Sequence, residues 1–139
     1  MSKFFIRDRK ILIVGGAGFI GHNLALRLKS LGAKITVLDG LTVNNLYSVK
    51  KNENNLPFPK LALKILNQRF FLLKKNKIPL KIVDARDYHK LSRVISSVKP
   101  QVIIHLAAVS HSNRSNKDPH STFDHSLRTL ENSLDNAKN

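Results

Sequence analysis

The fold is decided by one stretch near the start of the chain, residues 10–21, which reads KILIVGGAGFIG. Its first half, Lys10–Val14, is a short apolar run typical of a fully buried strand. After the glycines, apolar residues recur at helical spacing until Gly32 supplies a stop: Ile20, Leu24, Leu28 and Leu31. The stretch therefore predicts a buried strand that turns directly into a helix.

Three glycines in this turn are spaced as a phosphate-binding loop requires. Gly15 permits a tight turn, Gly18 lets the backbone approach a pyrophosphate, and Gly21 allows the helix to pack closely on the strand. Free N–H groups at the start of the helix attract a phosphate. An ordinary glycine-rich turn is the alternative, but the place between a strand and a helix favours a dinucleotide site.

Asp39 ends the second predicted strand, Lys34–Leu38, and lies 18 residues after Gly21. A carboxylate there accepts hydrogen bonds from both hydroxyls of an adenine ribose and repels a 2′-phosphate. The residue therefore favours NAD over NADP, although a basic residue from the neighbouring loop would weaken that preference. The alternative is that Asp39 caps a loop, since Asp-Gly is a common turn pair.

Strands and helices alternate along the chain, which is the pattern of a parallel sheet wrapped by crossover helices. After Lys10–Val14, the predicted strands are Lys34–Leu38, Leu80–Val83 and Gln101–Leu106. The helices after the first are predicted from three apolar stripes: Leu63, Leu66, Phe70 and Leu73; Tyr88, Leu91, Val94, Ile95 and Val98; and Phe123, Leu127, Leu130 and Leu134, with Ser121 or Thr122 as the cap of the last. The stretch from Leu41 to Pro59 has the Asn and Pro content of a loop. We predict an α/β fold, a truncated Rossmann-type doubly wound parallel sheet of four strands in the order 3-2-1-4 with helices on both faces.

The composition fits one globular domain. The chain has 139 residues, no cysteine, and 24 Lys and Arg against 9 Asp and Glu, a formal charge of +15. We expect residues 1–9 to be a lead-in and residues 10–139 to form one NAD-binding domain, incomplete at its C-terminus. The absence of cysteine excludes disulfides and thiolate nucleophiles. No apolar run approaches the roughly 20 residues of a membrane span, so we expect a cytoplasmic protein with no membrane partner.

The positive charge is concentrated in residues 44–81, which hold nine basic residues and one acidic residue. Such a charge permits binding to nucleic acid, acidic membranes or phosphorylated small molecules. The few aromatic residues fall mostly on predicted buried faces, which disfavours a nucleic-acid platform. We interpret the charge as a solvated helical face and expect no specific nucleic-acid partner.

Two further motifs, together with the glycine turn and Asp39, give the sequence a resemblance to a known family. It resembles the N-terminal half of proteins of the extended short-chain dehydrogenase/reductase family, and more narrowly of its NAD-dependent nucleotide-sugar epimerases and dehydratases. The motifs are Asp84-Ala85-Arg86-Asp87 and Ile104-His105-Leu106-Ala107-Ala108, which follow the glycine turn and Asp39 in register. The resemblance runs from about Lys10 to Ala137 and implies NAD as the cofactor. It identifies no substrate.

The resemblance also implies roles for residues around the cofactor. Asp84 would accept a hydrogen bond from the adenine amino group, with the backbone of Ala85 beside the ring. Ala107 and Ala108 would pass close to the ribose and phosphates, where small side chains leave room. We expect Asp87, in contrast, to act as the N-cap of the helix that follows it.

Phe19 and Ile20 would, by the same resemblance, hold the phosphate loop against the sheet. The complete set of expected cofactor-binding residues is Gly15, Gly18, Phe19, Ile20, Gly21, Asp39, Asp84, Ala85, Ala107 and Ala108.

The sequence departs from the family pattern in several places. His125 stands where family members carry an Asn, and the segment Thr42–Lys77 is longer than the usual connection. The family's catalytic Tyr-x-x-x-Lys pair lies on a helix after a fifth strand, which this chain does not reach. Tyr47 and Lys51 match the spacing in a predicted loop, where residues four apart need not share a face, so we interpret the match as a coincidence. We therefore expect no catalytic residue.

From these patterns we expect the NAD-binding portion of a nucleotide-sugar epimerase- or dehydratase-like protein, inactive alone, which meets a nucleotide sugar only with a C-terminal half. The alternatives are a non-catalytic NAD-binding regulatory or scaffold module and, less favoured, a basic nucleic-acid-binding domain. The unpaired edge of the fourth strand would promote self-association. We expect no metal, because the histidine separations fit no zinc pattern and His105 is better explained as structural: His105, His111, His120 and His125.

Overall fold

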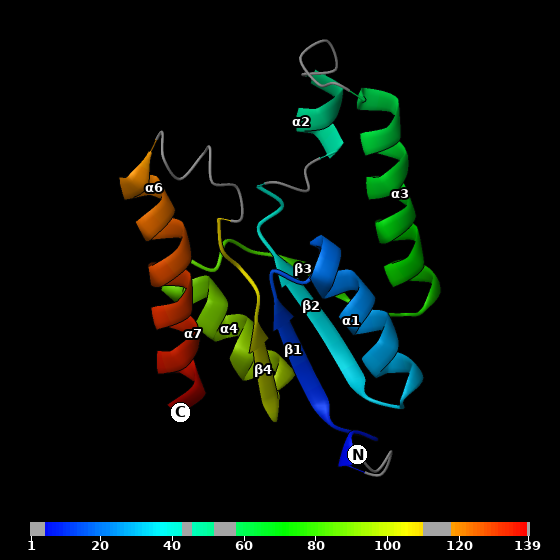
Figure 1. Ribbon diagram of the computed structural model, residues 1–139. Helices are drawn as coiled ribbons and strands as arrows, with labels where there is room; N and C mark the ends of the chain where they lie inside the picture. Colours follow the sequence, from blue (N-terminus) through cyan, green and yellow to red (C-terminus); the bar gives the residue numbers. More distant parts are fainter. Residues whose placement is uncertain (1–4, 43–45, 52–57, 110–117, 139) are drawn as a thin grey trace.

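The strands form one parallel sheet in the order β3-β2-β1-β4 (Figure 1). The computed structural model describes residues 5–42, 46–51, 58–109 and 118–138. The strands are β1 (Lys10–Val14), β2 (Lys34–Asp39), β3 (Leu80–Ile82) and β4 (Val102–His105). The predicted Rossmann-like α/β sheet and its strand order are confirmed.

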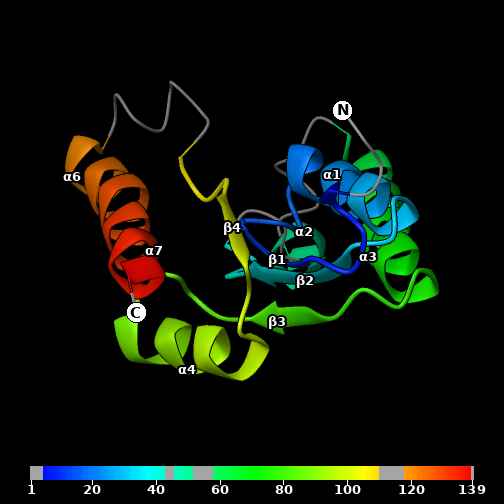
Figure 2. The ribbon, with the colours of Figure 1, turned by 90° about the horizontal axis from the view of Figure 1, so that it is seen from below.

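Helices cover both faces of this sheet. Figure 2 shows α1 and α3 over one face and α4 under the other, and α7 packs against α4 and β4. The helices are α1 (Phe19–Ser30), α2 (Leu46–Lys51), α3 (Pro59–Lys75), α4 (Tyr88–Val98), α6 (Pro119–Phe123) and α7 (Thr129–Lys138), with a π-helical turn, η3 (Asp124–Arg128), between the last two. Among the described residues, no helix is long and apolar enough to cross a membrane.

The strict alternation of side chains along β1 builds a core on each face. Ile11 and Ile13 pack in one cluster with residues of α1 and α3. Leu12 and Val14 point the other way and pack with residues of α4. Because β1 is covered on both faces, Leu12, Ile13 and Val14 are completely buried, as its continuous apolar sequence predicts.

The carboxyl end of β1 lies against the chain that leaves β4. The backbone N–H of Leu106 donates to the carbonyl of Val14 at 2.8 Å, and that of Gly15 donates to Leu38 at 2.7 Å. Gly15 has a φ of +79°, and a Cβ there would lie 2.6 Å from the backbone nitrogen of Ala107. Both the conformation and the space therefore require glycine at position 15.

The Asn and Pro content of residues 41–59 predicted a loop, but part of this stretch is helical. The short helix α2 occupies Leu46–Lys51 within this stretch. Tyr47 and Lys51 therefore belong to a helix, so the loop argument against this pair is wrong. The next helix, α3, begins at Pro59, because the fixed φ of proline suits the first position of a helix.

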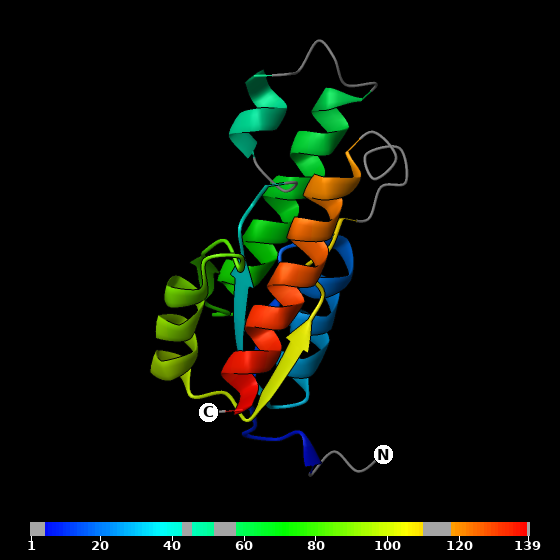
Figure 3. The ribbon, with the colours of Figure 1, turned by 90° about the vertical axis from the view of Figure 1, so that its left-hand side faces the viewer.

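The last helical segment turns its apolar residues outward, opposite to the prediction. Phe123, Leu127, Leu130 and Leu134 are all exposed, at 67%, 46%, 36% and 58%. The buried positions of α7 are instead polar: Thr129, Asn132, Ser133 and Asn136. Figure 3 shows the resulting arrangement, in which this segment runs alongside β4.

Hydrogen bonds explain why the polar face of α7 is the buried one. The Asn132 side-chain amide donates to the carbonyls of Ala85 and Arg86, each at 2.9 Å. The Ser133 hydroxyl lies 3.0 Å from Nδ1 of His105 at the end of β4. Buried polar groups cost free energy unless they find such partners, so these contacts fix the helix orientation.

The N-cap predicted for α4 is confirmed, and the N-cap predicted for the last helical segment is not. Asp87 is the N-cap of α4, and its carboxylate accepts a hydrogen bond from the N–H of Lys90 at 3.0 Å. The cap of α6 is Asp118, which accepts from the N–H of Ser121. The expected cap at Ser121 or Thr122 is therefore wrong, because the helix begins at Pro119.

We expect Gly15→Ala to lower the free energy of unfolding by about 2 kcal/mol or more, because the new methyl meets backbone and the residue keeps a left-handed conformation. Gly18→Ala is the matched control, since a Cβ at Gly18 meets only the carbonyl oxygen of Gly15, at 3.3 Å. It should change stability by about 0.5 kcal/mol or less. Urea unfolding followed by circular dichroism measures both, and equal losses would contradict the close approach at Gly15.

Candidate functional site

A cavity of about 680 Å³ opens at the carboxyl ends of β1, β2 and β4. Ligands of open α/β sheets bind at this edge, where the order of strands reverses direction. The cavity is lined by every residue that the sequence predicted for the cofactor: Gly15, Gly18, Phe19, Ile20, Gly21, Asp39, Asp84, Ala85, Ala107 and Ala108. Segments far apart in the sequence therefore meet at one site.

The glycine turn presents backbone to this cavity. Gly18 is the N-cap of α1, and the first turn of that helix contains no acidic residue. A Cβ on Gly21 would lie 2.5 Å from the Cα of Gly16, so the helix start is packed directly on the turn. Gly18, in contrast, lines the cavity, and only the carbonyl oxygen of Gly15, at 3.3 Å, lies within 4 Å of its missing Cβ. Backbone N–H groups and the dipole at the start of α1 favour an anion at this place.

Asp39 links the end of β2 to the glycine turn. One carboxylate oxygen accepts from the N–H of Ala17 at 2.9 Å, and the other accepts from the N–H of Leu41 at 2.8 Å. The residue is buried, with 8% of its surface exposed. Burial raises the pKa of Asp39, and the two backbone hydrogen bonds oppose that rise. Each oxygen keeps a lone pair that could accept a hydroxyl of a ligand.

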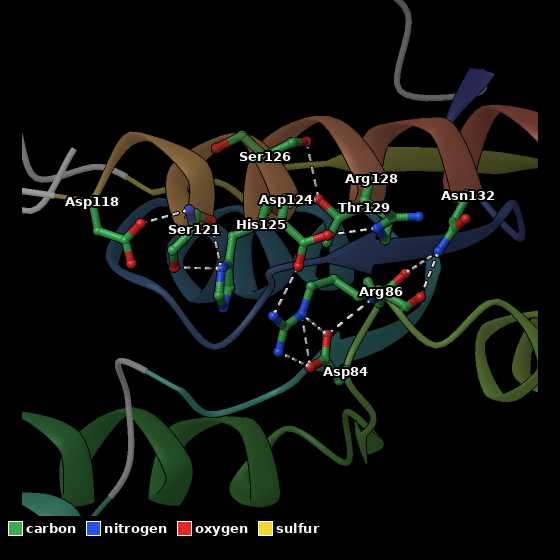
Figure 4. Close-up of polar contacts among 11 residues, drawn as sticks. Asp84, Arg86, Asp118, Ser121, Asp124, His125, Ser126, Arg128, Thr129 and Asn132 are labelled. Carbon is green, nitrogen blue, oxygen red and sulfur yellow. Dashed lines mark hydrogen bonds and ion pairs between the residues drawn. The ribbon is translucent and has the colours of Figure 1, made fainter. Parts of the chain in front are cut away.

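Asp84 belongs to a ladder of alternating charges that joins the end of β3 to the last helical segment (Figure 4). The Arg86 guanidinium donates to both oxygens of Asp84, at 2.6 to 3.1 Å, and to Asp124 at 3.2 Å. Arg128 donates to the other oxygen of Asp124 at 2.6 Å. The hydrogen bonds from Arg86 lower the pKa of Asp84, so this carboxylate stays ionised to lower pH than usual. The ladder fixes the orientation of Asp84 at the cavity wall.

From the sequence we expected Phe19 and Ile20 to hold the turn against the sheet, but the structure shows that they do not. Their side chains are 71% and 65% exposed and line the cavity. The expectation is wrong because Gly21, not its larger neighbours, supplies the close contact with the turn. The Phe19 ring instead lies beneath a cation, with the guanidinium carbon of Arg69 5.9 Å from its centroid.

His105 and His125 have different places around the cavity. His105 is held by Ser133 and by the carbonyl of Ala107, 2.9 Å from Nε2, which fits the structural role predicted for it. His125 lines the cavity, and its Nδ1 donates to the carbonyl of Ser121 at 2.7 Å. The described part of the chain holds no group of three His, Cys, Asp or Glu side chains that could bind a metal, and His111 lies outside it.

Sequence reasoning missed the cavity wall contributed by α2, α3 and the last helical segment. The missed residues include Val49, Ala62, Ile65, Leu66, Arg69 and Thr129. Helical spacing was the available signal for α3, because positions 62, 65, 66 and 69 share one face.

Comparison with known proteins shows similarity along nearly the whole chain. A model of the NAD dependent epimerase/dehydratase family matches residues 11–139. The chain is 36% identical over 128 residues to a dTDP-D-glucose 4,6-dehydratase of Dictyostelium discoideum and 29% identical over 126 residues to UDP-glucose 4-epimerase 1 of Oryza sativa subsp. japonica. These alignments cover 91% and 86% of this chain but only 24% and 29% of the two relatives. The chain thus spans less than a third of their length.

The fold is also similar to that of a solved structure with a nucleotide bound. The UDP-glucose 4-epimerase of Thermus thermophilus, in complex with NAD, superposes with a TM-score of 0.67 and 26% sequence identity. The superposition covers 91% of this chain and 32% of that enzyme.

We expect the two carboxylates of the cavity to titrate in opposite directions from the ordinary Asp pKa of 3.8, Asp39 above it and Asp84 below it. Between 3.8 and the raised pKa of Asp39, the folded chain binds more protons there than the unfolded chain, so this group lowers stability as pH rises through that window. Asp84 has the opposite sign, and its contribution is lost as pH falls. Carboxyl ¹³C NMR titration measures both values, and Asp39 titrating below Asp84 would contradict the described geometry.

Proposed function

The chain belongs to the NAD dependent epimerase/dehydratase family, and on that premise we propose that residues 10–139 bind NAD in the cavity at the strand ends, with residues 1–9 as a lead-in. The observation that carries this proposal is the convergence of all ten predicted cofactor residues on one cavity. They come from the turn after β1, from the first residues of α1 and from the chain at or just after the ends of β2, β3 and β4. The sequence-based alternative of an ordinary glycine-rich turn does not account for that convergence.

Each part of NAD has a matching group in the cavity. The pyrophosphate would lie on the glycine turn, where Gly18 leaves open space beside the start of α1. Asp39 would accept the adenine ribose hydroxyls, and Asp84 the adenine amino group, with Ala85 beside the ring. Ala107 and Ala108 would leave room for the rest of the dinucleotide.

The burial of Asp39 supports NAD rather than NADP. A 2′-phosphate would approach a carboxylate that has little solvent around it to screen the repulsion. The ribose hydroxyls, in contrast, would donate to its remaining lone pairs. The same carboxylate already holds the glycine turn through Ala17, so it would couple ribose recognition to the shape of the pyrophosphate site.

For the complete reaction, the relatives act on nucleotide sugars, and we propose that this chain supplies the cofactor part of such a reaction. Gly18, Asp39 and Asp84 would hold NAD, which would supply the acceptor and donor of a hydride. The residues of this chain would bind and orient the dinucleotide and exclude water from it. A non-catalytic NAD-binding module is the second candidate. Specific nucleic-acid binding forms no part of the proposal.

Self-association forms a further part of the proposal. β4 is the last strand in the order β3-β2-β1-β4 and pairs with β1 on one side, and no other described strand pairs with it. Exposed strand edges favour pairing with a second chain.

Calorimetric titration tests the cofactor. We expect Gly18→Val to weaken NAD binding by roughly tenfold to a hundredfold, because overpacking costs about 1–3 kcal/mol. Asp39→Ala should weaken it by about tenfold and reduce the preference over NADP, since a hydrogen bond to a charged group contributes about 1.5–3 kcal/mol. Asp8→Ala removes an exposed carboxylate and is the control for Asp39→Ala. Unchanged NAD binding by Gly18→Val would contradict the proposed position of the pyrophosphate on the glycine turn.

We also expect the chain alone to show no epimerase or dehydratase turnover. General acid–base catalysis typically contributes about 10²–10⁴-fold, and positioning of the sugar contributes further, so a chain that spans less than a third of its relatives' length should leave the reaction too slow to measure. The assay uses UDP-, GDP- and dTDP-sugars with NAD, and substrate disappearance is followed. Turnover that disappears in Tyr47→Phe or Lys51→Ala would show instead that the pair in α2 is catalytic.

A further inference from the structure

One face of the long helix α3 forms a wall of the NAD cavity. The cavity-lining residues of this helix are Ala62, Ile65, Leu66 and Arg69. Their spacing places them on a single helical face, with three apolar side chains followed by one cation. Beyond Arg69, Leu73 packs into the core beside Ala25 and Leu28 of α1, so the helix is anchored to the element that begins at the glycine turn.

Arg69 is held close to the start of α1. Its guanidinium carbon lies 5.9 Å from the centroid of the Phe19 ring, a cation–π distance. Phe19 is the first residue of α1 and directly follows Gly18. α3 and α1 also contact each other, and Figure 1 shows them side by side on one face of the sheet. The cation is therefore positioned beside the phosphate-binding end of the site.

The charges around the cavity give this cation a role. Its described lining contains two carboxylates, Asp39 and Asp84, and Arg69 is its one Lys or Arg residue. A dinucleotide adds two further negative charges through its pyrophosphate. The partial positive charge at the start of α1 favours these groups, but a full charge nearby favours them more.

We propose that Arg69 binds the pyrophosphate of the dinucleotide from the α3 side of the cavity, an inference that rests on the proposed NAD-binding function. The planar guanidinium suits two phosphate oxygens at once, and its contact with the Phe19 ring pre-orients it for that purpose. The pyrophosphate is favoured over a 2′-phosphate because Arg69 contacts the residue after Gly18, whereas Asp39 occupies the ribose end.

The test compares Arg69→Gln with Lys64→Gln, which removes the same charge from an exposed position of the same helix. NAD, ADP, adenosine and adenosine 2′-phosphate are titrated calorimetrically into each protein. Arg69→Gln should weaken NAD and ADP by about tenfold and leave adenosine unchanged, because only the first two carry the pyrophosphate. Lys64→Gln should bind all four ligands as the wild type does. Arg69→Lys should lie between the wild type and Arg69→Gln, since it keeps the charge but loses the planar fork.

The outcomes separate this inference from the function on which it rests. NAD binding by Arg69→Gln equal to that of the wild type would overturn the role of Arg69 and leave the NAD site intact. An equal loss for adenosine and ADP would indicate a structural role and would also overturn it. A loss confined to adenosine 2′-phosphate would assign the cation to the ribose instead of the pyrophosphate. A wild-type chain that binds neither NAD nor ADP would overturn the proposed function, and the role of Arg69 with it.

Discussion

The close approach of backbone to backbone at the carboxyl end of β1 is the constraint on which the rest of the site depends. Gly15 lies against the backbone of Ala107, and Gly21 lies against Gly16, with no room for a Cβ at either glycine. Asp39 then joins the end of β2 to the same turn through the N–H of Ala17. These contacts bring the ends of three strands together, and the cavity forms in the space above them.

The opposite wall is held by charge and hydrogen bonding rather than by apolar packing. The ladder from Asp84 through Arg86 and Asp124 to Arg128 connects the end of β3 with η3. Asn132 adds two hydrogen bonds to the backbone of the same loop. Directional contacts of this kind position a wall well, because each one requires a particular geometry of both partners. The apolar wall on the α3 side is positioned by core packing instead.

Local patterns predicted the sheet because they report burial directly. The continuous apolar sequence of β1 and the glycines after it predicted the turn, the alternation of strands and helices along the chain predicted the strand order, and the end of the second strand gave the place of Asp39. The same kind of pattern gave the wrong buried face for the last helical segment. Periodicity shows that apolar residues share one face of a helix, but it does not show which face packs against the rest of the domain. There the choice was made by Asn132 and its partners, more than forty residues away in sequence. α2 was missed because its neighbouring Asn and Pro residues dominate the local composition.

The outward apolar face of α7 has a consequence for how the fold opens. Burial of apolar surface is the main force that holds a helix on a domain, and here α7 buries polar residues while Leu130 and Leu134 stay exposed. Its attachment therefore rests on a small number of hydrogen bonds, each contributing about 0.5–1.5 kcal/mol net. Segments held in this way generally open at a lower free energy than that of global unfolding, so we expect α7 to detach before the sheet unfolds. Detachment would uncover the cavity beside Ala85 and, through the loss of Thr129, beside Ala107, while leaving the glycine turn in place, so both of these walls would open to solvent before the phosphate-binding turn did.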